Sequence, residues 1–162
     1  MTRFPEIVIR PWGHSGPDKM MVRNHIKSYL LETGAGDATE SNVDLLYDRG
    51  LRAVSAGYPT IVARVDDAGG DDPPCSILLC GRPEGGVVST ALSTAEIVLS
   101  YTDPDYRRQG IREAMRELAL RWLRKMEVKL VIGAARFDDA KTVEDLTKHG
   151  AKPLLVVWGR EP

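Results

Sequence analysis

Apolar and polar positions follow two different spacings along this chain, and the spacing predicts where strands and helices lie. Runs rich in β-branched and apolar residues are typical of strands, whereas apolar residues three and four positions apart are typical of amphipathic helices. The runs predict strands at 7–12, 59–65, 76–81, 95–102, 129–134 and 154–158. The helical spacing predicts helices at 18–32, at a segment capped by Ser41–Asp44 and ended by Gly57, at 106–125 and at 138–149.

The predicted order is one strand, two helices, three strands, a helix, a strand, a helix and a last strand. This order predicts an α/β fold, because helices and strands are interleaved along the chain. The sequence contains no repeat, no low-complexity segment and no linker long enough to divide it. We therefore expect residues 1–162 to form a single domain, present as a monomer or a homodimer.

Composition excludes several classes of protein. Apolar residues make up 43% of the chain and charged residues 28%, which is normal for a globular protein. There is no apolar run of membrane-spanning length, and the N-terminal residues lack the pattern of a signal peptide. The formal net charge is −1, without the basic excess of a dedicated nucleic-acid binder. We expect a cytoplasmic protein with no membrane and no nucleic-acid partner.

The two cysteines, Cys75 and Cys80, lie on one predicted strand. Five is an odd step, so their side chains should face opposite sides of the sheet. This geometry argues against a disulfide and against a shared metal, and two buried structural thiols are the better interpretation. No other residues show the spacing of metal ligands, so we expect no metal.

The segment 96–115 contains the clearest candidate chemistry. A strand runs into a Pro-containing turn, and a basic loop with Gly110 then opens a long helix. The first N–H groups of a helix lack intrahelical partners and lie at the positive end of its dipole, which makes an anion site that suits a pyrophosphate. Gly110 lets the backbone approach the phosphates, and Arg107 and Arg108 add positive charge.

Arg107–Ile111 resembles the start of the GNAT superfamily signature, Gln/Arg-x-x-Gly-x-Gly/Ala, and Thr102–Arg107 is similar to the usual lead-in. The resemblance implies a mixed, mostly antiparallel central sheet flanked by helices, with acetyl-CoA as the acyl donor at the strand–loop–helix cradle. It implies an N-acetyltransferase acting on an amine of a small molecule or a protein. The implied cofactor-binding residues are Ser100, Tyr101, Thr102, Arg107, Arg108, Gln109, Gly110, Ile111 and Arg112. A backbone N–H near Ser100–Thr102 is expected to polarise the thioester carbonyl.

Two positions depart from the pattern. Arg112 stands where the signature has a small residue, and its side chain either points to solvent or reaches a CoA phosphate. Leu146 stands where many members have a Tyr general acid, so the residue that protonates the thiolate is not evident. These departures keep open an inactive GNAT-like domain that acts as a CoA-binding or protein-interaction module.

Glu96 is the candidate general base. It lies fourteen positions before Gly110 on an otherwise apolar strand, and the histone-acetyltransferase branch has its base Glu at a similar spacing. A carboxylate in apolar surroundings should have a raised pKa, which suits a base. The alternative is a half-exposed or salt-bridged Glu at a strand start. Tyr101 either faces the acceptor or belongs to the core, and His25 is expected at the surface.

Overall fold

The computed structural model describes residues 6–12, 16–34, 36–66, 74–83, 93–133, 144 and 147–148. Residues Met1–Ile132 form one compact unit and Gly133–Pro162 form a second. In the second unit Glu144, Thr147 and Lys148 are helical, and Lys148 Nζ lies 2.7 Å from Glu144 Oε1. Most of the helix predicted at 138–149, Leu146 and the strand predicted at 154–158 lie outside the described residues. The expectation of a single domain stays a prediction.

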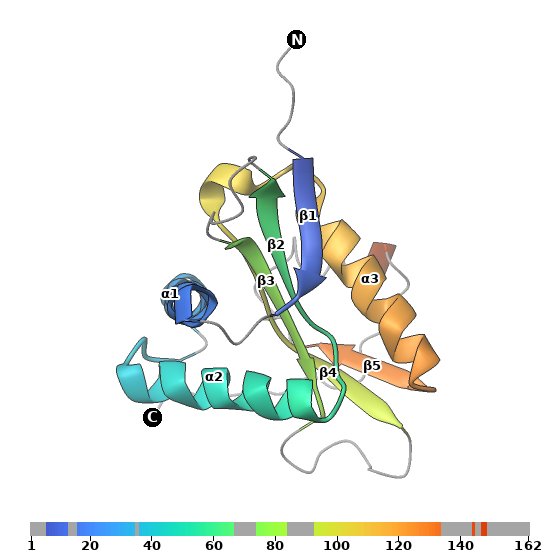
Figure 1. Cartoon of the computed structure of the whole chain (residues 1–162). Helices are drawn as coiled ribbons and strands as arrows, with labels where there is room; N and C mark the ends of the chain where they lie inside the picture. Colours follow the sequence, from blue (N-terminus) through green and yellow to red (C-terminus); the bar gives the residue numbers. More distant parts are fainter. Residues whose placement is uncertain are drawn as a thin grey trace. The chain divides into compact units, whose positions relative to one another are not determined.

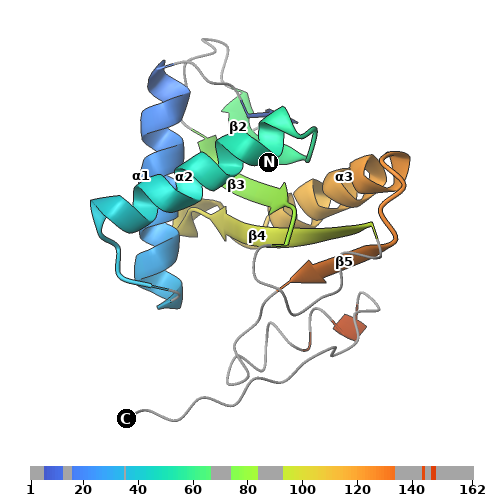
Figure 2. The same ribbon diagram turned by 90° about the horizontal axis from the view of Figure 1, so that it is seen from below.

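The first unit is built on a five-stranded sheet in the order β1-β2-β3-β4-β5. The strands are β1 (Glu6–Pro11), β2 (Thr60–Asp66), β3 (Pro74–Gly81), β4 (Thr94–Thr102) and β5 (Leu130–Gly133). The first three neighbouring pairs are antiparallel. β5 runs in the same direction as β4 (Figure 2), and the N–H of Lys129 donates to the carbonyl of Ser93 at 2.8 Å, so both strands start side by side. The sheet is therefore mixed and mostly antiparallel, as predicted.

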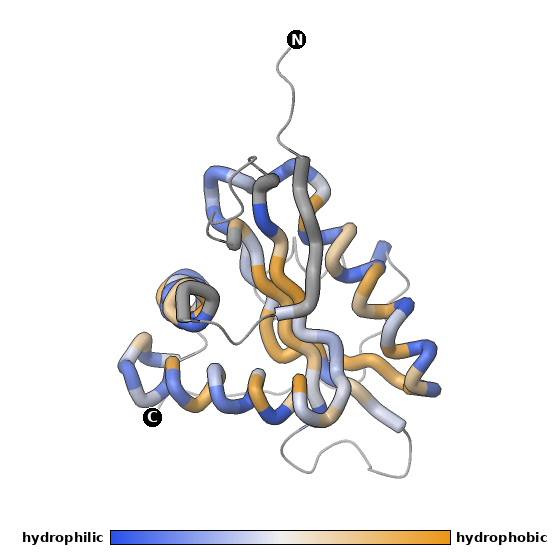
Figure 3. The backbone as a smooth tube through the Cα atoms, in the orientation of Figure 1, coloured by the Kyte–Doolittle hydropathy of each residue, from blue (hydrophilic) through white to orange (hydrophobic). Residues whose placement is uncertain are grey.

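Helices cover both faces of this sheet (Figure 1). The helices are α1 (Gly16–Thr33), α2 (Glu40–Ser55) and α3 (Ile111–Lys125). α1 and α2 pack on one face, where the core cluster includes Ile26, Val43 and Leu99. α3 packs on the other face, where Met115 and Leu123 are both 1% exposed. Figure 3 shows the resulting pattern, with apolar segments concentrated along the central strands.

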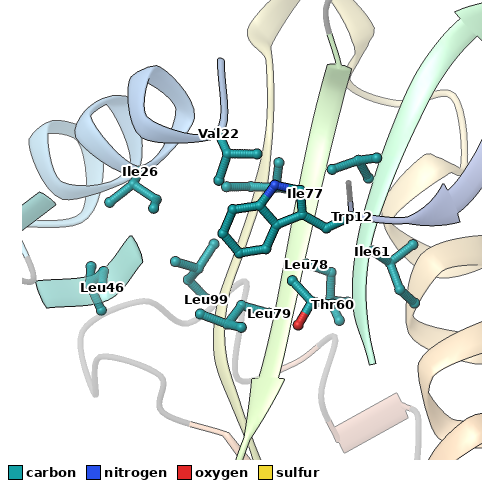
Figure 4. Close-up of a pocket in the computed structure, with 11 residues that line it drawn as sticks. Trp12, Val22, Ile26, Leu46, Thr60, Ile61, Ile77, Leu78, Leu79 and Leu99 are labelled. Carbon is teal, nitrogen blue, oxygen red and sulfur yellow. The ribbon is translucent and has the colours of Figure 1, made fainter. Parts of the chain in front are cut away.

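Trp12 follows β1 and fills the space under α1 and α2. Its ring is 6% exposed and meets the ring of Tyr47 edge-on, with centroids 5.0 Å apart. Figure 4 shows it in a pocket between α1, α2 and the sheet, where the side chains around it are almost all apolar. This pocket is part of the core and offers no charged group to a phosphate.

Gly50, in the middle of α2, packs closely against Trp12, and a substitution at Gly50 tests this packing. A Cβ at Gly50 would lie 2.5 Å from Cζ3 of Trp12, so Gly50→Ala should destabilise the fold by about 1–3 kcal/mol through overpacking. At an unhindered helix position the same change would stabilise by about 1 kcal/mol. Chemical denaturation measures whether Gly50→Ala raises or lowers the free energy of unfolding. Gly81→Ala is the matched control, because its Cβ would meet only ordinary contacts at 3.6 Å; equal stability of both variants would contradict the prediction.

Two predicted helix starts are wrong by several residues. α2 begins at Glu40, and its cap is Thr39, whose hydroxyl accepts a hydrogen bond from the N–H of Asn42 at 3.3 Å; the cap is not within Ser41–Asp44. α3 begins at Ile111 and not at residue 106, because Pro104–Tyr106 form a separate 3₁₀ turn. The stretch between that turn and Ile111 is therefore loop, which leaves the start of α3 accessible.

The prediction that Cys75 and Cys80 face opposite sides of the sheet is also wrong. Pairing shifts from Ala63 with Ser76 to Arg64 with Pro74, so Cys75 is an extra residue in β3 and turns to the α3 side. Cys80 lies in the same cluster. Both thiols are nevertheless free and buried, as expected. Burial raises the pKa of Cys80 to about 12, so this thiol stays protonated at neutral pH and is no nucleophile.

Candidate functional site

The start of α3 has the geometry that an anion requires. Gly110 precedes the helix with φ +75°, a left-handed conformation, and no side chain caps the helix there. The first helical hydrogen bond runs from the N–H of Ala114 to the carbonyl of Gly110 at 3.0 Å. The N–H groups of Ile111, Arg112 and Glu113 precede it and have no intrahelical partner. A Cβ built at Gly110 would have no atom within 4 Å, so open space faces this turn.

The loop before α3 is held in a defined shape. Asp103 accepts a hydrogen bond from the N–H of Asp105 at 3.1 Å and donates its own N–H to the carbonyl of Cys75 at 2.9 Å. Arg108 also has a positive φ, 65°, and is exposed. Gln109 folds back, with its Nε2 3.5 Å from the carbonyl of Asp105. The left-handed turns at Arg108 and Gly110 therefore lead the chain into α3.

Two of the predicted cofactor residues already have protein partners. Arg107 donates from Nε to the carbonyl of Thr102 at 3.0 Å and from Nη2 to Glu32 Oε2 at 2.5 Å. The neighbouring Glu32 raises the pKa of the Arg107 guanidinium, so its charge is permanent. Arg112 is exposed, and its Nε lies 3.3 Å from Oγ of Ser100. Arg112 therefore leans back toward the end of β4.

The end of β4 lies directly beside this loop. β4 pairs Leu99 with Leu79 and Ile97 with Cys80, so Val98 is an extra, bulged residue. β5 starts next to Ser93 and contributes few residues, so its pairing with β4 ends near this bulge. Within the described chain, the last residues of β4 therefore have β3 on one side only. Among the described residues, no strand pairs with their other edge.

The side chains at the end of β4 point to different faces. Ser100 is on the side of α3, where it meets Arg112. Tyr101 is 9% exposed and belongs to the cluster under α1 and α2, so the core alternative holds for its ring. Thr102 pairs its hydroxyl with Oγ of Ser76 at 2.9 Å. Ile111 is buried against the sheet, so only its backbone faces the site.

Glu96 lies farther back on β4 and is ion-paired. Its Oε2 is 2.6 Å from Nη2 of Arg49 on α2, and the two side chains are 22% and 16% exposed. Arg49 Nη2 also donates to the carbonyl of Arg82 at 3.3 Å. Glu96 is therefore salt-bridged, as the alternative interpretation of this residue expected. A role of Glu96 as a base stays a prediction.

The structure thus brings Ser100, Thr102, Arg107, Gly110 and Arg112 to one place at the end of β4. Sequence reasoning missed one partner of each of three candidate residues: Glu32 beside Arg107, His25 beside Tyr101, and Arg49 beside Glu96. His25 is partly buried and not at the surface: its ring meets Tyr101 edge-on at 5.5 Å, and its Nδ1 lies 2.9 Å from the carbonyl of Met21. The available signal was that position 25 lies four residues from Met21 and from Tyr29, on the same face of the predicted helix as both.

Among the described residues, no group of His, Cys, Asp and Glu is arranged to hold a metal ion. No helix in the described part of the chain is long and apolar enough to span a bilayer. The end of β4 with the loop before α3 is the candidate site.

Comparison with known proteins supports the fold. No family model matches the chain, and no curated protein matches its sequence. Among solved structures, the aminoglycoside N-acetyltransferase AAC(6')-Iy in complex with CoA is 12% identical, with a TM-score of 0.68 over 99% of this chain and 98% of that chain. The NatC complex bound to Gag peptide and CoA is 15% identical, with a TM-score of 0.67 over 90% and 83%. A GCN5-related N-acetyltransferase from Ralstonia eutropha JMP134 is 16% identical, with a TM-score of 0.65 over 96% and 97%.

These similarities cover nearly the whole chain, whereas the sequence identities are low. They show that the chain has the GNAT fold, which confirms the fold implied by the signature around Gly110. The strand–loop–helix segment at the end of β4 is thus set in the sheet and helix order that the resemblance implies.

Proposed function

We propose that this protein is an N-acetyltransferase that transfers the acetyl group of acetyl-CoA directly to an amine. One observation carries the proposal: the uncapped start of α3 lies beside the edge of β4 with which no described strand pairs. The first provides N–H groups for an anion, and the second provides a strand edge along which an extended donor can lie. The fold shared with acetyltransferases that were solved with CoA supports the same conclusion.

The residues at the cradle fit the phosphates of CoA. The N–H groups of Ile111, Arg112 and Glu113 would bind the pyrophosphate, and Gly110 leaves the approach open. Arg108 and Arg112 are exposed cations on either side of Gly110. Gln109 folds back on the loop, so it would contribute its backbone.

Acetyl transfer needs little side-chain chemistry. The amine nitrogen attacks the thioester carbon, a C–N bond forms and the C–S bond breaks; the amine loses a proton and the thiolate gains one. A backbone N–H on this edge of β4, within Ser100–Thr102, would stabilise the oxyanion. Glu96 is the proposed acceptor of the amine proton. The donor of the thiolate proton is not assigned, because position 146, where many GNAT members have a Tyr, is a Leu.

The proposed acceptor is an amine of a small molecule or a protein. One structural neighbour is an aminoglycoside N-acetyltransferase, and another is bound to a peptide, so the fold alone selects neither. The surface of α1 and α2 has mixed charge: Arg23 forms ion pairs with Asp44 and, at 3.0 Å, with Glu40. This surface does not favour a strongly acidic or strongly basic acceptor.

Calorimetric titration with CoA, followed by acetyl-CoA turnover on a panel of amines, tests the proposal. The panel should include aminoglycosides and peptide N-termini, and release of free CoA thiol reports turnover. Cys75 and Cys80 are buried, so the protein's own thiols should contribute little to this signal. We expect saturable binding and acetylation of at least one amine class. Absence of CoA binding, or binding without transfer to any amine, would contradict the proposal.

Arg112 provides a more specific test of the cradle. Because its guanidinium leans over the end of β4, we expect Arg112→Ala to weaken CoA binding by about 1–2 kcal/mol, the scale of a charge-assisted hydrogen bond. Calorimetry measures the loss. Arg121→Ala removes an exposed Arg farther along α3 and should leave the affinity unchanged. Tighter binding by Arg112→Ala would mean that this side chain blocks the cradle.

A further inference from the structure

The contact between Arg107 and Glu32 joins the cradle loop to the end of α1. These residues are 75 positions apart in sequence, and their side chains meet at 2.5 Å. Arg107 lies three positions before Gly110, in the loop that leads to the proposed phosphate site. Glu32 is in the last turn of α1, which contains no basic residue. An acid at a helix C-terminus is disfavoured by the helix dipole, so Glu32 depends on the cation that Arg107 supplies.

Arg107 does not depend on Glu32 in the same way. Its Nε donates to the carbonyl of Thr102, and its guanidinium lies 5.7 Å from the ring centroid of Tyr101. Both of these contacts come from β4. The side chain would therefore keep its place if the carboxylate of Glu32 were removed, and the main effect of Glu32 on Arg107 is to neutralise it.

The ion pair is weak enough to be exchanged. The side chains of Arg107 and Glu32 are 40% and 49% exposed, and an exposed pair of this kind changes an equilibrium by no more than about fivefold. Glu32 meets Arg107 through one nitrogen and one oxygen only, whereas a phosphate that presents two oxygens can form two parallel charge-assisted hydrogen bonds with the same guanidinium. A phosphate that reached Arg107 would therefore outcompete the carboxylate.

Resting on the proposed function, we propose that Glu32 is an internal anion that occupies Arg107 until a phosphate of CoA replaces it. Cofactor binding then releases the last turn of α1 from the cradle loop. In the absence of CoA, the ion pair between Glu32 and Arg107 competes with cofactor binding, and it couples the cradle to α1.

Calorimetry with CoA on the full-length chain tests the exchange. Glu32→Gln keeps the shape of the side chain and removes its charge, so CoA should bind about 2–5-fold more tightly at low salt, with a smaller difference at high salt. In an Arg107→Gln background, Glu32→Gln should have no effect, because the cation it neutralises is gone. Glu127→Gln, beyond the far end of α3, makes the same change of charge and should leave the affinity unchanged.

Hydrogen exchange gives a second readout. The N–H of Gly34 donates to the carbonyl of Leu30 at 3.1 Å at the end of α1, and CoA should accelerate exchange of the amides in this turn. Weaker or unchanged CoA binding by Glu32→Gln, or an equal gain in the Arg107→Gln background or in Glu127→Gln, would overturn the exchange. If neither the parent chain nor Glu32→Gln bound CoA, the proposed function would fall as well. Binding by Glu32→Gln alone would support the inference.

Discussion

Replacing Gly110 by Glu should reduce CoA binding at least about 100-fold, to below detection in a calorimetric titration. The change places a carboxylate beside the N–H groups that would hold the pyrophosphate, where the helix dipole favours an anion and a fixed negative charge would repel a second one. It also adds a Cβ at φ +75°, a conformation that non-glycine residues avoid. The space around that Cβ is open, so the side chain itself should not prevent folding.

Gly57→Glu is the matched control for the strain. Gly57 follows α2 with φ +81°, and a Cβ there also has no atom within 4 Å. Both variants therefore carry a similar backbone cost, about 1–2 kcal/mol, but only one lies at the cradle. CoA affinity should be normal in Gly57→Glu and lost in Gly110→Glu. Normal CoA binding by a folded Gly110→Glu protein would contradict the assignment of the CoA site to the start of α3.

Most of the sheet and the helices α1, α2 and α3 were predictable from residue spacing. The strand at 95–102 and its antiparallel neighbours follow from β-branched and apolar runs, and the observed β4 is Thr94–Thr102. The long helix α3, which ends at Lys125, was predicted from its apolar stripe, but its start was predicted too early. Tyr106 and Arg107 fit a helical pattern locally, whereas the left-handed turn at Gly110 decides where the helix begins.

The errors have a common physical cause, because bulges and long-range contacts leave no periodic signal. A single extra residue in β3 turned Cys75 to the face opposite the one predicted. The bulge at Val98 and the short β5, which leave the edge of β4 without a described partner strand, are likewise properties of pairing between strands. The local motif indicated the glycine before α3, which depends on neighbours in sequence. It could not indicate that Glu32 reaches Arg107 from another helix.

Glu96 illustrates the same limit, because the residue that controls its surroundings is Arg49 on α2. An isolated carboxylate on an apolar strand suggested a base, but the structure gives it a guanidinium at 2.6 Å. The pair accounts for one carboxylate oxygen, Oε2, and the other can still accept a proton from an amine. The two possible roles of Glu96, proton acceptor and structural anion, therefore predict different effects of substitutions at Glu96 and at its partner Arg49.

If Glu96 accepts the proton, Glu96→Gln should lower acetyl-CoA turnover at neutral pH about 100-fold, because a carboxamide is no base, and leave CoA affinity nearly unchanged. Arg49→Gln breaks the same ion pair but keeps the carboxylate. Both variants should lose about 1–3 kcal/mol of stability, since each removes the charge pairing between two partly buried side chains. Steady-state kinetics and denaturation on the two variants separate the roles. Turnover lost only in Glu96→Gln identifies the base, whereas equal losses in both, in step with stability, would return Glu96 to a structural anion.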